Sequence, residues 1–406
     1  MASGGEGLLT LSIPMRVSPE PEGIGLLERY NMALNYALSK ILRLDIRSIK
    51  NAHRELYREL VEWFRLPSRA AIDCYRDALA NAKAWRKNPN RGRRPRIKKL
   101  SMLLHHGSGY RIRDGYVEII GGIRLKIIGW DRRYDDYENR EARLVYKNDK
   151  MILWISKRVP KPLKYSPRGV LAIDVNEKYI VVGNNVFEYR FETTVDRSLH
   201  YKKLAEDLQK KYSSTRYNAW LRRRGVRERI RRFHEKTRNI VVDWVKKISH
   251  RITMLAKQKQ YAVAREDLTN LVEGLRRLPR DHRIRLIILS YRKLGLWIDW
   301  QSEKYGVPIL VVDPRRTSSI CPRCGSRLVE NGYRVLKCPR CGFEADRDRV
   351  AVLNIEKKAL LRMGGSLTTP TAPQMTDVAP NRCGEPMNRP QRGGGTLALQ
   401  DGEEVR

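Results

Sequence analysis

The first part of the chain alternates apolar and polar residues and then changes to a helical pattern. The alternation from Leu8 to Val17 predicts a β-strand, which ends at the Pro- and Gly-rich break at residues 19–23. From Ile24 to about Trp85 apolar residues recur three and four positions apart, which predicts helices, and Pro67 divides them into at least two. Residues 83–99 carry nine Lys and Arg and no acid, so we expect a loop that faces phosphates.

Short alternating runs follow between Met102 and Pro160, separated by Gly, Asp and Asn turns. This pattern is typical of a small β-barrel or sheet. The strand at residues 8–17 has no partner within the helical stretch. We therefore expect it to complete the later sheet, which makes the helices an insertion into a β domain.

The pattern after residue 162 predicts an α/β nuclease domain. Its order β, β, β, α, β, α, β, α is that of the RNase H type of fold, with a cysteine-rich insert before the last helix. From Gly364 the chain is rich in Gly, Pro, Thr and Asn, which predicts a disordered tail. The expected divisions are residues 1–23 (leader and first strand of the β domain), 24–95 (helical insertion), 96–166 (β-barrel), 167–361 (nuclease domain with a zinc-ribbon insert at 317–345) and 362–406 (disordered tail).

The charge of the chain narrows the choice of partner. Its 406 residues include 82 Lys and Arg against 45 Asp and Glu, a net charge of +37, while 41% of residues are hydrophobic. The apolar fraction excludes a wholly disordered chain, and the charge favours a polyanion, with nucleic acid first and an anionic membrane second. A run of about 20 apolar residues is absent from the sequence, and the N-terminus lacks the layout of a secretory signal. We expect a cytoplasmic protein.

Four of the six cysteines form two tight pairs, Cys321-Pro-Arg-Cys324 and Cys338-Pro-Arg-Cys341, each followed by Gly. Two such turns supply the four thiolates of a tetrahedral Zn²⁺ site, whereas free thiols or a redox pair would not explain the duplication. Since protein ligands would fill all four positions, we expect one structural zinc. No metal role is expected for the two other cysteines, Cys74 and Cys383.

Three acidic residues occupy special places in the predicted domain. Asp174 lies inside an apolar strand, Glu266 ends the strand that begins at residue 261, and Asp348 opens the last helix. These elements are neighbours in an RNase H topology, so the carboxylates would converge. We expect them to hold two Mg²⁺ ions about 4 Å apart and to hydrolyse a phosphodiester.

Other interpretations of these acids remain open. Asp174 could instead cap a turn through Asn176. Glu266 and the adjacent Asp267 could be surface charge. Asp346 competes with Asp348, because either could be the N-cap of the last helix.

Arginine runs supply the expected contacts with a nucleic-acid backbone. Residues 222–232 hold seven Arg and one Glu, and residues 276–285 hold five Arg and one Asp. Surface helices usually mix both signs, so runs of one sign favour phosphate contact. Four nearby aromatic residues could stack on bases or belong to the core: Tyr212, Tyr217, Trp220 and Phe233. The expected contacts are Arg91, Arg93, Arg94, Arg222, Arg223, Arg224, Arg231 and Arg232.

Several motifs together resemble one family. They are Ala172-Ile173-Asp174-Val175-Asn176, Arg265-Glu266-Asp267-Leu268, Val312-Asp313-Pro314 with Thr317-Ser318 before the first cysteine pair, the two cysteine pairs themselves, and Asp346-Arg347-Asp348 through Asn354-Ile355. Over residues 168–361 the chain resembles the TnpB (OrfB) proteins of insertion sequences, compact RNA-guided DNA nucleases related to the type V CRISPR effectors.

The resemblance implies that Asp174, Glu266 and Asp348 are RuvC-like catalytic carboxylates, which favours Asp348 over Asp346. It implies that the β domain and its helical insertion correspond to wedge and recognition lobes. It also implies a guide RNA and target DNA as partners, and the transposase of the same element as a further one. The chain departs from the family at Asn176, Val350 and Val352.

The leading hypothesis is therefore a transposon-encoded, Mg²⁺-dependent, RNA-guided DNA endonuclease of a prokaryotic cytoplasm. The alternative is a non-cleaving nucleic-acid-binding regulator, or a transposase accessory protein, on the same scaffold. Val350 is the sequence feature that favours this alternative, because an apolar side chain there could weaken hydrogen bonding around the last carboxylate.

Overall fold

The computed structural model describes residues 7–89, 92, 94–213, 221–268, 279–289 and 291–364, and it divides into two compact units, residues 1–161 and 162–406. Two of the predicted nucleic-acid contacts, Arg91 and Arg93, lie outside the described residues, as do Cys383 and most of the predicted tail. Among the described helices none is long and apolar enough to cross a membrane.

Seven strands and three helices make up most of the first unit. The strands form one antiparallel sheet in the order β2-β6-β7-β1-β5-β4-β3. In chain order the elements are β1 (Leu8–Val17), α1 (Pro21–Arg43), α2 (Ile49–Glu62), α3 (Ser68–Lys87), β2 (Leu100–Leu104), β3 (Tyr110–Arg113), β4 (Tyr116–Ile119), β5 (Ile123–Trp130), the short 3₁₀ helix at Arg132–Tyr134, β6 (Asn139–Lys147) and β7 (Lys150–Pro160).

The first strand lies inside this sheet although all three helices separate it from the other strands. It pairs along its whole length with β7, from Leu8 opposite Pro160 to Val17 opposite Met151, and with β5 on its other side. The sequence predicts that this strand completes the later sheet, and its place between β7 and β5 confirms that prediction. A single bridge joins His106, just after β2, to Tyr110 at the start of β3, so the two edge strands approach each other and the sheet is nearly closed.

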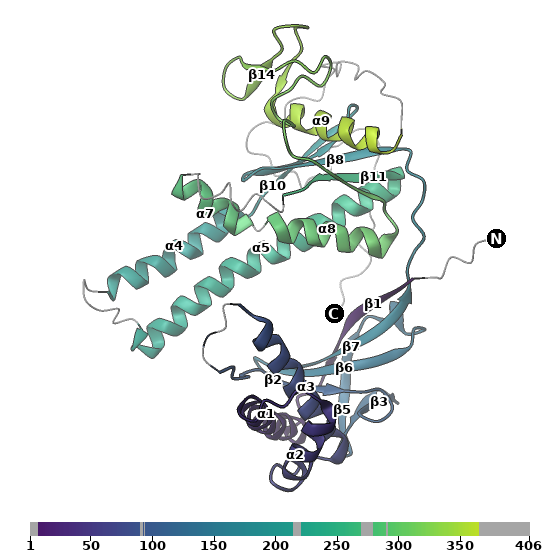
Figure 1. The fold of residues 1–406 in the computed structure, drawn as a ribbon, viewed down its shortest axis with the longest axis vertical. Helices are drawn as coiled ribbons and strands as arrows, with labels where there is room; N and C mark the ends of the chain where they lie inside the picture. The colour runs from purple at the N-terminus through teal and green to yellow at the C-terminus, as the bar shows by residue number, and fades with distance from the viewer. Residues whose placement is uncertain are drawn as a thin grey trace, which may run out of the picture. The chain divides into compact units, whose positions relative to one another are not determined.

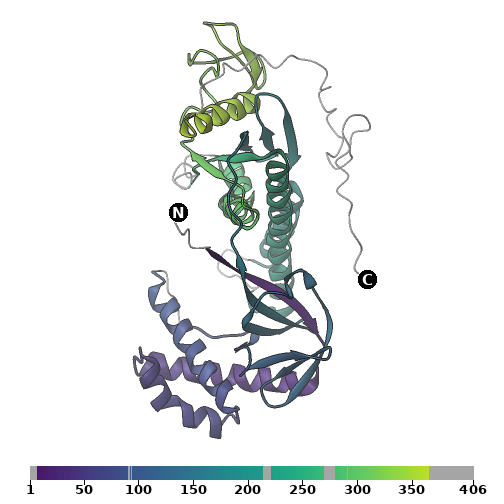
Figure 2. The same ribbon diagram turned by 90° about the vertical axis from the view of Figure 1, so that its right-hand side faces the viewer.

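The helices α1–α3 begin and end differently from the prediction. Helix α1 starts at Pro21 rather than at Ile24, because proline fits the first turn of a helix, where its missing N–H is not needed. Helix α3 continues to Lys87, so the expected basic loop begins after residue 87 and not at residue 83. Figure 2 shows the three helices packed beside the strands of this unit.

A buried ion pair joins the helical block to the sheet. Asp77 of α3 is buried and accepts hydrogen bonds from both terminal nitrogens of Arg143 in β6, each at 3.1 Å. A bidentate guanidinium–carboxylate pair fixes the relative orientation of its two partners. The helical insertion is therefore attached to the sheet by a specific contact as well as by apolar packing.

The second unit is an α/β fold around a five-stranded sheet of order β10-β9-β8-β11-β12. Strands β8, β11 and β12 are parallel, and β9 and β10 are antiparallel to them. The bounds are β8 (Gly169–Val175), β9 (Tyr179–Gly183), β10 (Glu188–Glu192), α4 (Val195–Lys211), α5 (Arg224–Lys259), β11 (Tyr261–Glu266), α7 (Arg280–Leu289), α8 (Tyr291–Tyr305), β12 (Ile309–Val312), β13 (Val329–Glu330), β14 (Val335–Lys337), β15 (Glu344–Asp346) and α9 (Arg347–Arg362).

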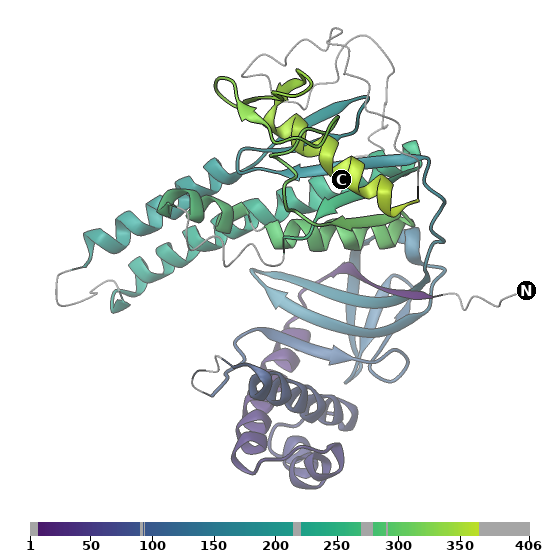
Figure 3. The same ribbon diagram turned by 45° about the horizontal axis from the view of Figure 1, so that its top comes forward.

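Helices cover both faces of this sheet, as Figure 1 shows. Helices α5 and α8 pack on one face against Leu171, Ile173 and Val263, and α9 packs on the other against Ala172 and Ala264. Helices α4 and α5 run side by side and extend beyond the sheet (Figure 3). The strand order and the position of α9 are those expected for the predicted RNase H-like topology.

The cysteine-rich insert forms a small separate sheet of order β13-β14-β15. Its last strand, β15, runs directly into α9. Val350 and Leu353 of α9 are buried against Cys321 and Cys338 of the insert. The insert is therefore anchored to the helix that carries Asp348.

Candidate active site and metal centre

Three carboxylates converge at one end of the five-stranded sheet. Asp174 lies near the end of β8 and Glu266 at the end of the neighbouring parallel strand β11, where Arg265 is paired with Ile173. The next residues in this register are Asp174 and Glu266, and adjacent strands are about 4.8 Å apart. Asp348 stands in the first turn of α9, which packs on the same sheet.

The amide of Asn176 links the first and the last of these carboxylates. Its Nδ2 donates to Asp174 Oδ2 at 2.9 Å and to Asp348 Oδ1 at 2.8 Å. Asp174 therefore accepts a bond from Asn176, but the same amide reaches across to α9, which a simple turn cap would not do. The role expected of Asn176 from the sequence was incomplete in this respect.

Burial raises the pKa of Asp174 to about 7, and the negative charges of Glu266 and then Asp348 add to the effect. Burial also raises the pKa of Glu266, against the hydrogen bond that its carboxylate accepts from the Thr317 hydroxyl at 2.6 Å. The buried Asp174 carboxylate lies near two other carboxylates that disfavour its charge, and a bound cation would remove this cost. Carboxylate oxygens are also the donors that Mg²⁺ prefers.

Asp346 and Asp348 have different roles at the start of α9. The Asp346 side chain accepts a hydrogen bond from the Asp348 backbone N–H at 2.9 Å and is the N-cap of the helix. Asp348 is buried, and its side chain faces Asn176 and Arg334. Of the two acids, Asp348 is the one that shares a hydrogen-bond donor with Asp174.

Arg334 and Thr317 contact the carboxylates and were not assigned this role from the sequence. Arg334 donates to Asp348 Oδ1 at 2.5 Å, and Thr317 donates to Glu266. Both residues belong to the cysteine-rich insert, far along the chain from β8 and β11. Thr317 was visible in the sequence as part of a motif before the first cysteine pair, whereas nothing in the sequence marks Arg334.

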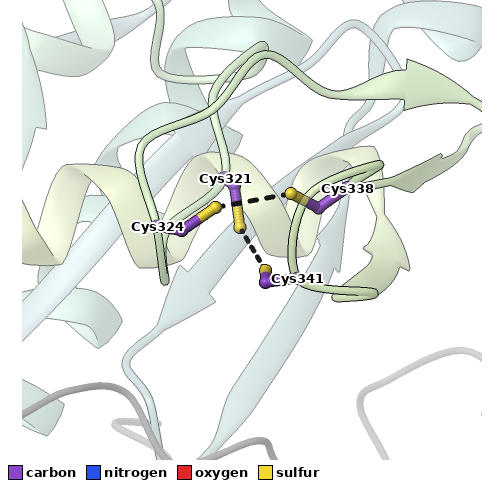
Figure 4. A group of neighbouring side chains, drawn as sticks. All are labelled: Cys321, Cys324, Cys338 and Cys341. Carbon is purple, nitrogen blue, oxygen red and sulfur yellow. Dashed lines mark hydrogen bonds between the residues drawn. The ribbon is translucent and has the colours of Figure 1, made fainter.

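The four cysteines form the second centre. Their sulfur atoms all lie within 4.8 Å of one another, with Cys321 Sγ 3.5 Å from Cys341 Sγ and Cys324 Sγ 3.4 Å from Cys338 Sγ (Figure 4). Zn–S bonds of about 2.3 Å in a tetrahedral site place sulfurs about 3.8 Å apart, so the donor set fits a zinc ion. This agrees with the spacing of the two pairs in the sequence.

Glycine makes the two cysteine turns possible. Gly325 and Gly342 have φ angles of +75° and +71°, and each donates its N–H to the carbonyl of the first cysteine of its pair. A residue with a side chain is strained in this region, so a glycine after each pair turns the chain and brings the thiols together. The glycine after each cysteine pair therefore explains both the repeated motif in the sequence and the shape of the turn.

Among the described residues, the cysteines are the only group of three or more His, Cys, Asp or Glu whose ligand atoms all lie within 4.8 Å of one another. The three carboxylates are close enough to shift the pKa of Asp174 but are not gathered as tightly. Each of them accepts a hydrogen bond from at least one of Asn176, Thr317 and Arg334.

The predicted nucleic-acid contacts that the structure describes are exposed. Arg94 follows the helical block, and Arg222, Arg223 and Arg224 stand at the start of α5. Two of the arginines have acidic partners one turn away within α5, where Arg224 pairs with Glu228 at 3.1 Å and Arg231 with Glu235 at 3.6 Å.

Around the start of α5, two of the described aromatic side chains already contact other side chains of the protein. The guanidinium of Arg223 lies over the Tyr212 ring, 4.9 Å from its centre, and Phe233 packs on Tyr201. Tyr217 and Trp220, which the sequence also suggested for stacking, lie outside the described residues.

The two valines that depart from the resemblance are packing residues. Val350 is fully buried against the cysteine-rich insert, and Val352 is fully buried against the sheet. Both side chains belong to buried apolar clusters.

Comparison with known proteins adds to this picture. The family described as "Cas12f1-like, TNB domain" matches residues 291–355. The chain is 28% identical over 250 residues to a TnpB-like protein of Methanocaldococcus jannaschii, which covers 58% of this chain and 86% of that protein. It is also 28% identical over 142 residues to the CRISPR-associated endodeoxyribonuclease Cas12f1 of Sulfoacidibacillus thermotolerans, over 32% of this chain and 30% of that one.

A solved structure shares the fold. The chain is similar to a cryo-EM structure of a Cas12f1–sgRNA–target DNA complex, with a TM-score of 0.53, 15% identity, and coverage of 82% of this chain and 81% of that one. At this identity the likeness concerns the fold alone.

Proposed function

The chain belongs to the TnpB family, which is related to the type V CRISPR effectors, and we propose that it is a transposon-encoded, RNA-guided DNA endonuclease. Relatives of the TnpB and Cas12 kinds support a nuclease. The finer proposal is that this chain cleaves DNA phosphodiester bonds at a RuvC-like site formed by Asp174, Glu266 and Asp348.

One observation carries this proposal: three carboxylates from β8, β11 and α9 meet at one end of a sheet, where the charges of Glu266 and Asp348 add to the rise in the pKa of Asp174. We propose that they hold two Mg²⁺ ions. Divalent cations at such a site supply an activated water and stabilise the leaving oxygen of a phosphodiester. The residues of the chain bind and orient: Asn176 keeps two carboxylates together, and the N-cap Asp346 fixes the first turn of the helix that carries the third.

The cysteine cluster is proposed to hold one structural zinc. With Cys321, Cys324, Cys338 and Cys341 as its four ligands, it would have no open position for a substrate. Its contribution would be to the folding of the insert and, through α9, to the position of Asp348.

Guide RNA and target DNA are the proposed partners. The net charge of +37 suits two nucleic acids, and the similar Cas12f1 structure is a complex with sgRNA and target DNA and without a transposase. We therefore do not propose a transposase partner. Base pairing with the guide would select the sequence, while the protein holds the backbone. We propose that the sheet of the first unit and its helical insertion act as wedge and recognition lobes.

The proposed contacts with the nucleic-acid backbone are arginines of residues 91–94 and 222–232. Exposed guanidinium groups near the start of a helix can contact phosphates without reading bases. These residues are Arg91, Arg93, Arg94, Arg222, Arg223, Arg224, Arg231 and Arg232.

The non-cleaving alternative is not favoured. It rested on Val350, and the side chain of Val350 packs against the cysteine-rich insert instead of replacing a polar group beside Asp348.

RNA sequencing and a cleavage assay test the proposal together. RNA that co-purifies with the wild-type chain and with Asp174→Ala should be one abundant species with a constant part and a variable end.

With that RNA and a matching DNA, the wild type should cleave in Mg²⁺, and both Asp174→Ala and Glu266→Gln should not. Asp267→Asn is the matched control, because it removes a charge next to Glu266 and should still cleave. Unchanged cleavage by Asp174→Ala would contradict the proposed site, and a featureless RNA population would contradict the guide.

A further inference from the structure

The cysteine-rich insert reaches two of the three carboxylates through side chains. It contributes Thr317, just before its first cysteine pair, and Arg334, from the turn between β13 and β14. The four cysteines that close the insert lie between and beyond these two residues in the chain. Whatever holds the insert in shape therefore also fixes two contacts with the candidate active site.

Thr317 is held firmly in its position. Its side chain is almost fully buried, and its hydroxyl is 2.6 Å from Glu266 Oε1 and 3.0 Å from the Pro314 carbonyl. Its own carbonyl accepts from Asn354 Nδ2 at 2.7 Å, and the same amide donates to the Ile320 carbonyl at 2.8 Å. The buried amide of α9 thus fixes the loop, and the loop delivers one hydroxyl to one oxygen of Glu266.

Arg334 reaches Asp348 from a strained turn. Its φ angle is +63°, a conformation that costs energy for a residue with a side chain and is often kept for a function. Its carbonyl accepts from the Arg347 N–H at 2.8 Å, which ties the turn to the start of α9. Its guanidinium donates to Asp348 Oδ1 and lies 3.9 Å from Asp346 Oδ2, while 40% of its side chain remains exposed.

The two contacts should have opposite effects on the binding of a cation by the carboxylates. The Thr317 hydroxyl carries no charge, and it orients Glu266 while leaving the second carboxylate oxygen, Oε2, outside this bond. The Arg334 guanidinium is positive and uses an oxygen of Asp348 that a cation would need. A positive charge at that distance repels a second cation and competes for the same oxygen.

We infer that the cysteine-rich insert sets the divalent-cation affinity of the carboxylate cluster through these two positioning residues, Thr317 supporting binding at Glu266 and Arg334 opposing it at Asp348. This inference rests on the proposed function, because it takes Asp174, Glu266 and Asp348 as cation ligands. It adds that the insert controls when the cluster is loaded. Arg334, half exposed, can move to a phosphate of an incoming strand and leave Asp348 to the cation.

Binding of Mn²⁺ to the full-length chain, freed of RNA at high salt, is the test. Electron paramagnetic resonance of free Mn²⁺ measures the dissociation constant without any cleavage. Thr317→Val keeps the shape of the side chain and should weaken Mn²⁺ binding about tenfold, because partners that orient metal ligands commonly contribute a factor of this size. Thr317→Ser keeps the hydroxyl and should stay near the wild type.

Arg334→Met should change the affinity in the other direction and tighten Mn²⁺ binding about threefold to tenfold, since a competing charge is removed. Arg334→Lys keeps the charge and should lie closer to the wild type. Two matched controls should leave binding unchanged: Arg327→Met removes an exposed arginine from the same insert, and Thr253→Val removes a buried hydroxyl from α5. The zinc content of every variant is measured alongside.

The outcomes separate this inference from the proposed function. If Asp348→Asn loses Mn²⁺ while Thr317→Val and Arg334→Met bind like the wild type, the inference is wrong and the carboxylate site stands. If both variants weaken binding, the insert acts only through folding and Arg334 does not compete. If the wild type binds no Mn²⁺ at millimolar concentration, the proposed metal site fails and the inference fails with it.

Discussion

The side-chain amide of Asn176 donates to Asp348 Oδ1 at 2.8 Å across 172 positions of the sequence. An amide nitrogen carries two protons, and the second serves Asp174 at 2.9 Å. One neutral side chain therefore holds together two carboxylates, from the first strand and the last helix of the nuclease-like unit, that would otherwise repel each other.

Replacing Asn176 should lower the stability of the second unit most when no cation is present. In Asn176→Ala the two carboxylates lose their shared donor, so the melting temperature of the second unit should fall by roughly 2–4 °C, as expected for about 1 kcal/mol in a unit of this size. Millimolar Mg²⁺ should reduce this difference, because a cation would replace the amide between the carboxylates.

Calorimetry with and without Mg²⁺ measures both values. Asn184→Ala is the control, because the Asn184 side chain accepts from the backbone of the β9–β10 turn and its cost should not depend on Mg²⁺. A deficit in Asn176→Ala that Mg²⁺ leaves unchanged would argue against cation binding at this pair.

Glu356 should make the metal-free protein less stable as the pH rises. It is buried in α9, and burial raises its pKa to about 7 from an ordinary value of 4.5, despite the nearby Arg349. The favourable contribution of its protonated form is complete below about pH 4.5 and is lost as the pH rises through about 7. Asp174, whose pKa is raised in the same direction, adds to this slope.

Glu356→Gln should therefore flatten the fall of the melting temperature between pH 5 and pH 8 in Mg²⁺-free buffer, with the larger gain over wild type at pH 8. Thermal melts at several pH values measure this. Glu330→Gln, which changes an exposed glutamate of the insert, should follow the wild-type curve. A Glu356→Gln curve parallel to that of the wild type would mean that Glu356 is ionised in the folded protein across this range.

Zinc should be present at one equivalent per chain and depend on all four clustered cysteines. Cys338→Ser should lose most of the bound zinc and unfold the insert, because a structural zinc contributes directly to folding. Elemental analysis after dialysis, together with limited proteolysis, measures both effects. Cys74→Ser should keep its zinc, because Cys74 lies buried in the first unit, whereas the four clustered cysteines belong to the second. Zinc loss in that control would show that the measured zinc is not bound at the cluster.

The arginines at the start of α5 should contribute salt-dependent affinity without sequence preference. Each phosphate contact contributes about 0.9 to the slope of log K against log salt, so Arg223→Gln with Arg232→Gln should lower the slope by about 1–2. Fluorescence anisotropy over a salt series with two unrelated nucleic-acid sequences measures it. Arg58→Gln, whose partner is Glu62 within α2, is the control. Equal slopes in both variants would remove these arginines from the interface.

The sequence predicted those parts of the fold that depend on local pattern. A few neighbouring residues determine the conformation of three such parts: the alternating strand at residues 8–17, the apolar strand that contains Asp174, and the cysteine pairs. The lack of a partner within the helical stretch predicts that β1 completes the later sheet, and the structure has it there, paired with β7 and β5. The predicted start of α1 was wrong by a few residues. A proline close to a glycine indicates a break in the chain, but Pro21 instead occupies the first turn of the helix.

The contacts around the carboxylates could not be predicted in the same way. Arg334 meets Asp348 only because a turn with a positive φ angle aims it back at α9, and no residue pattern specifies that direction. The choice between Asp346 and Asp348 also needed the helix geometry, in which the cap and the inward-facing acid are two positions apart. The catalytic role of the three carboxylates stays a prediction.

The place of β1 in the middle of its sheet has a consequence for synthesis on the ribosome. The strand emerges first, but its long partner β7 is the last strand of the unit. At about 5–20 residues per second the nascent strand waits roughly 10–30 s for β7, with the edge that pairs with β7 unpaired, while α1–α3 lack the complete sheet on which they pack. The helical block is thus made well before its support, and a nascent chain stalled ahead of residue 150 should engage chaperones that bind exposed strands.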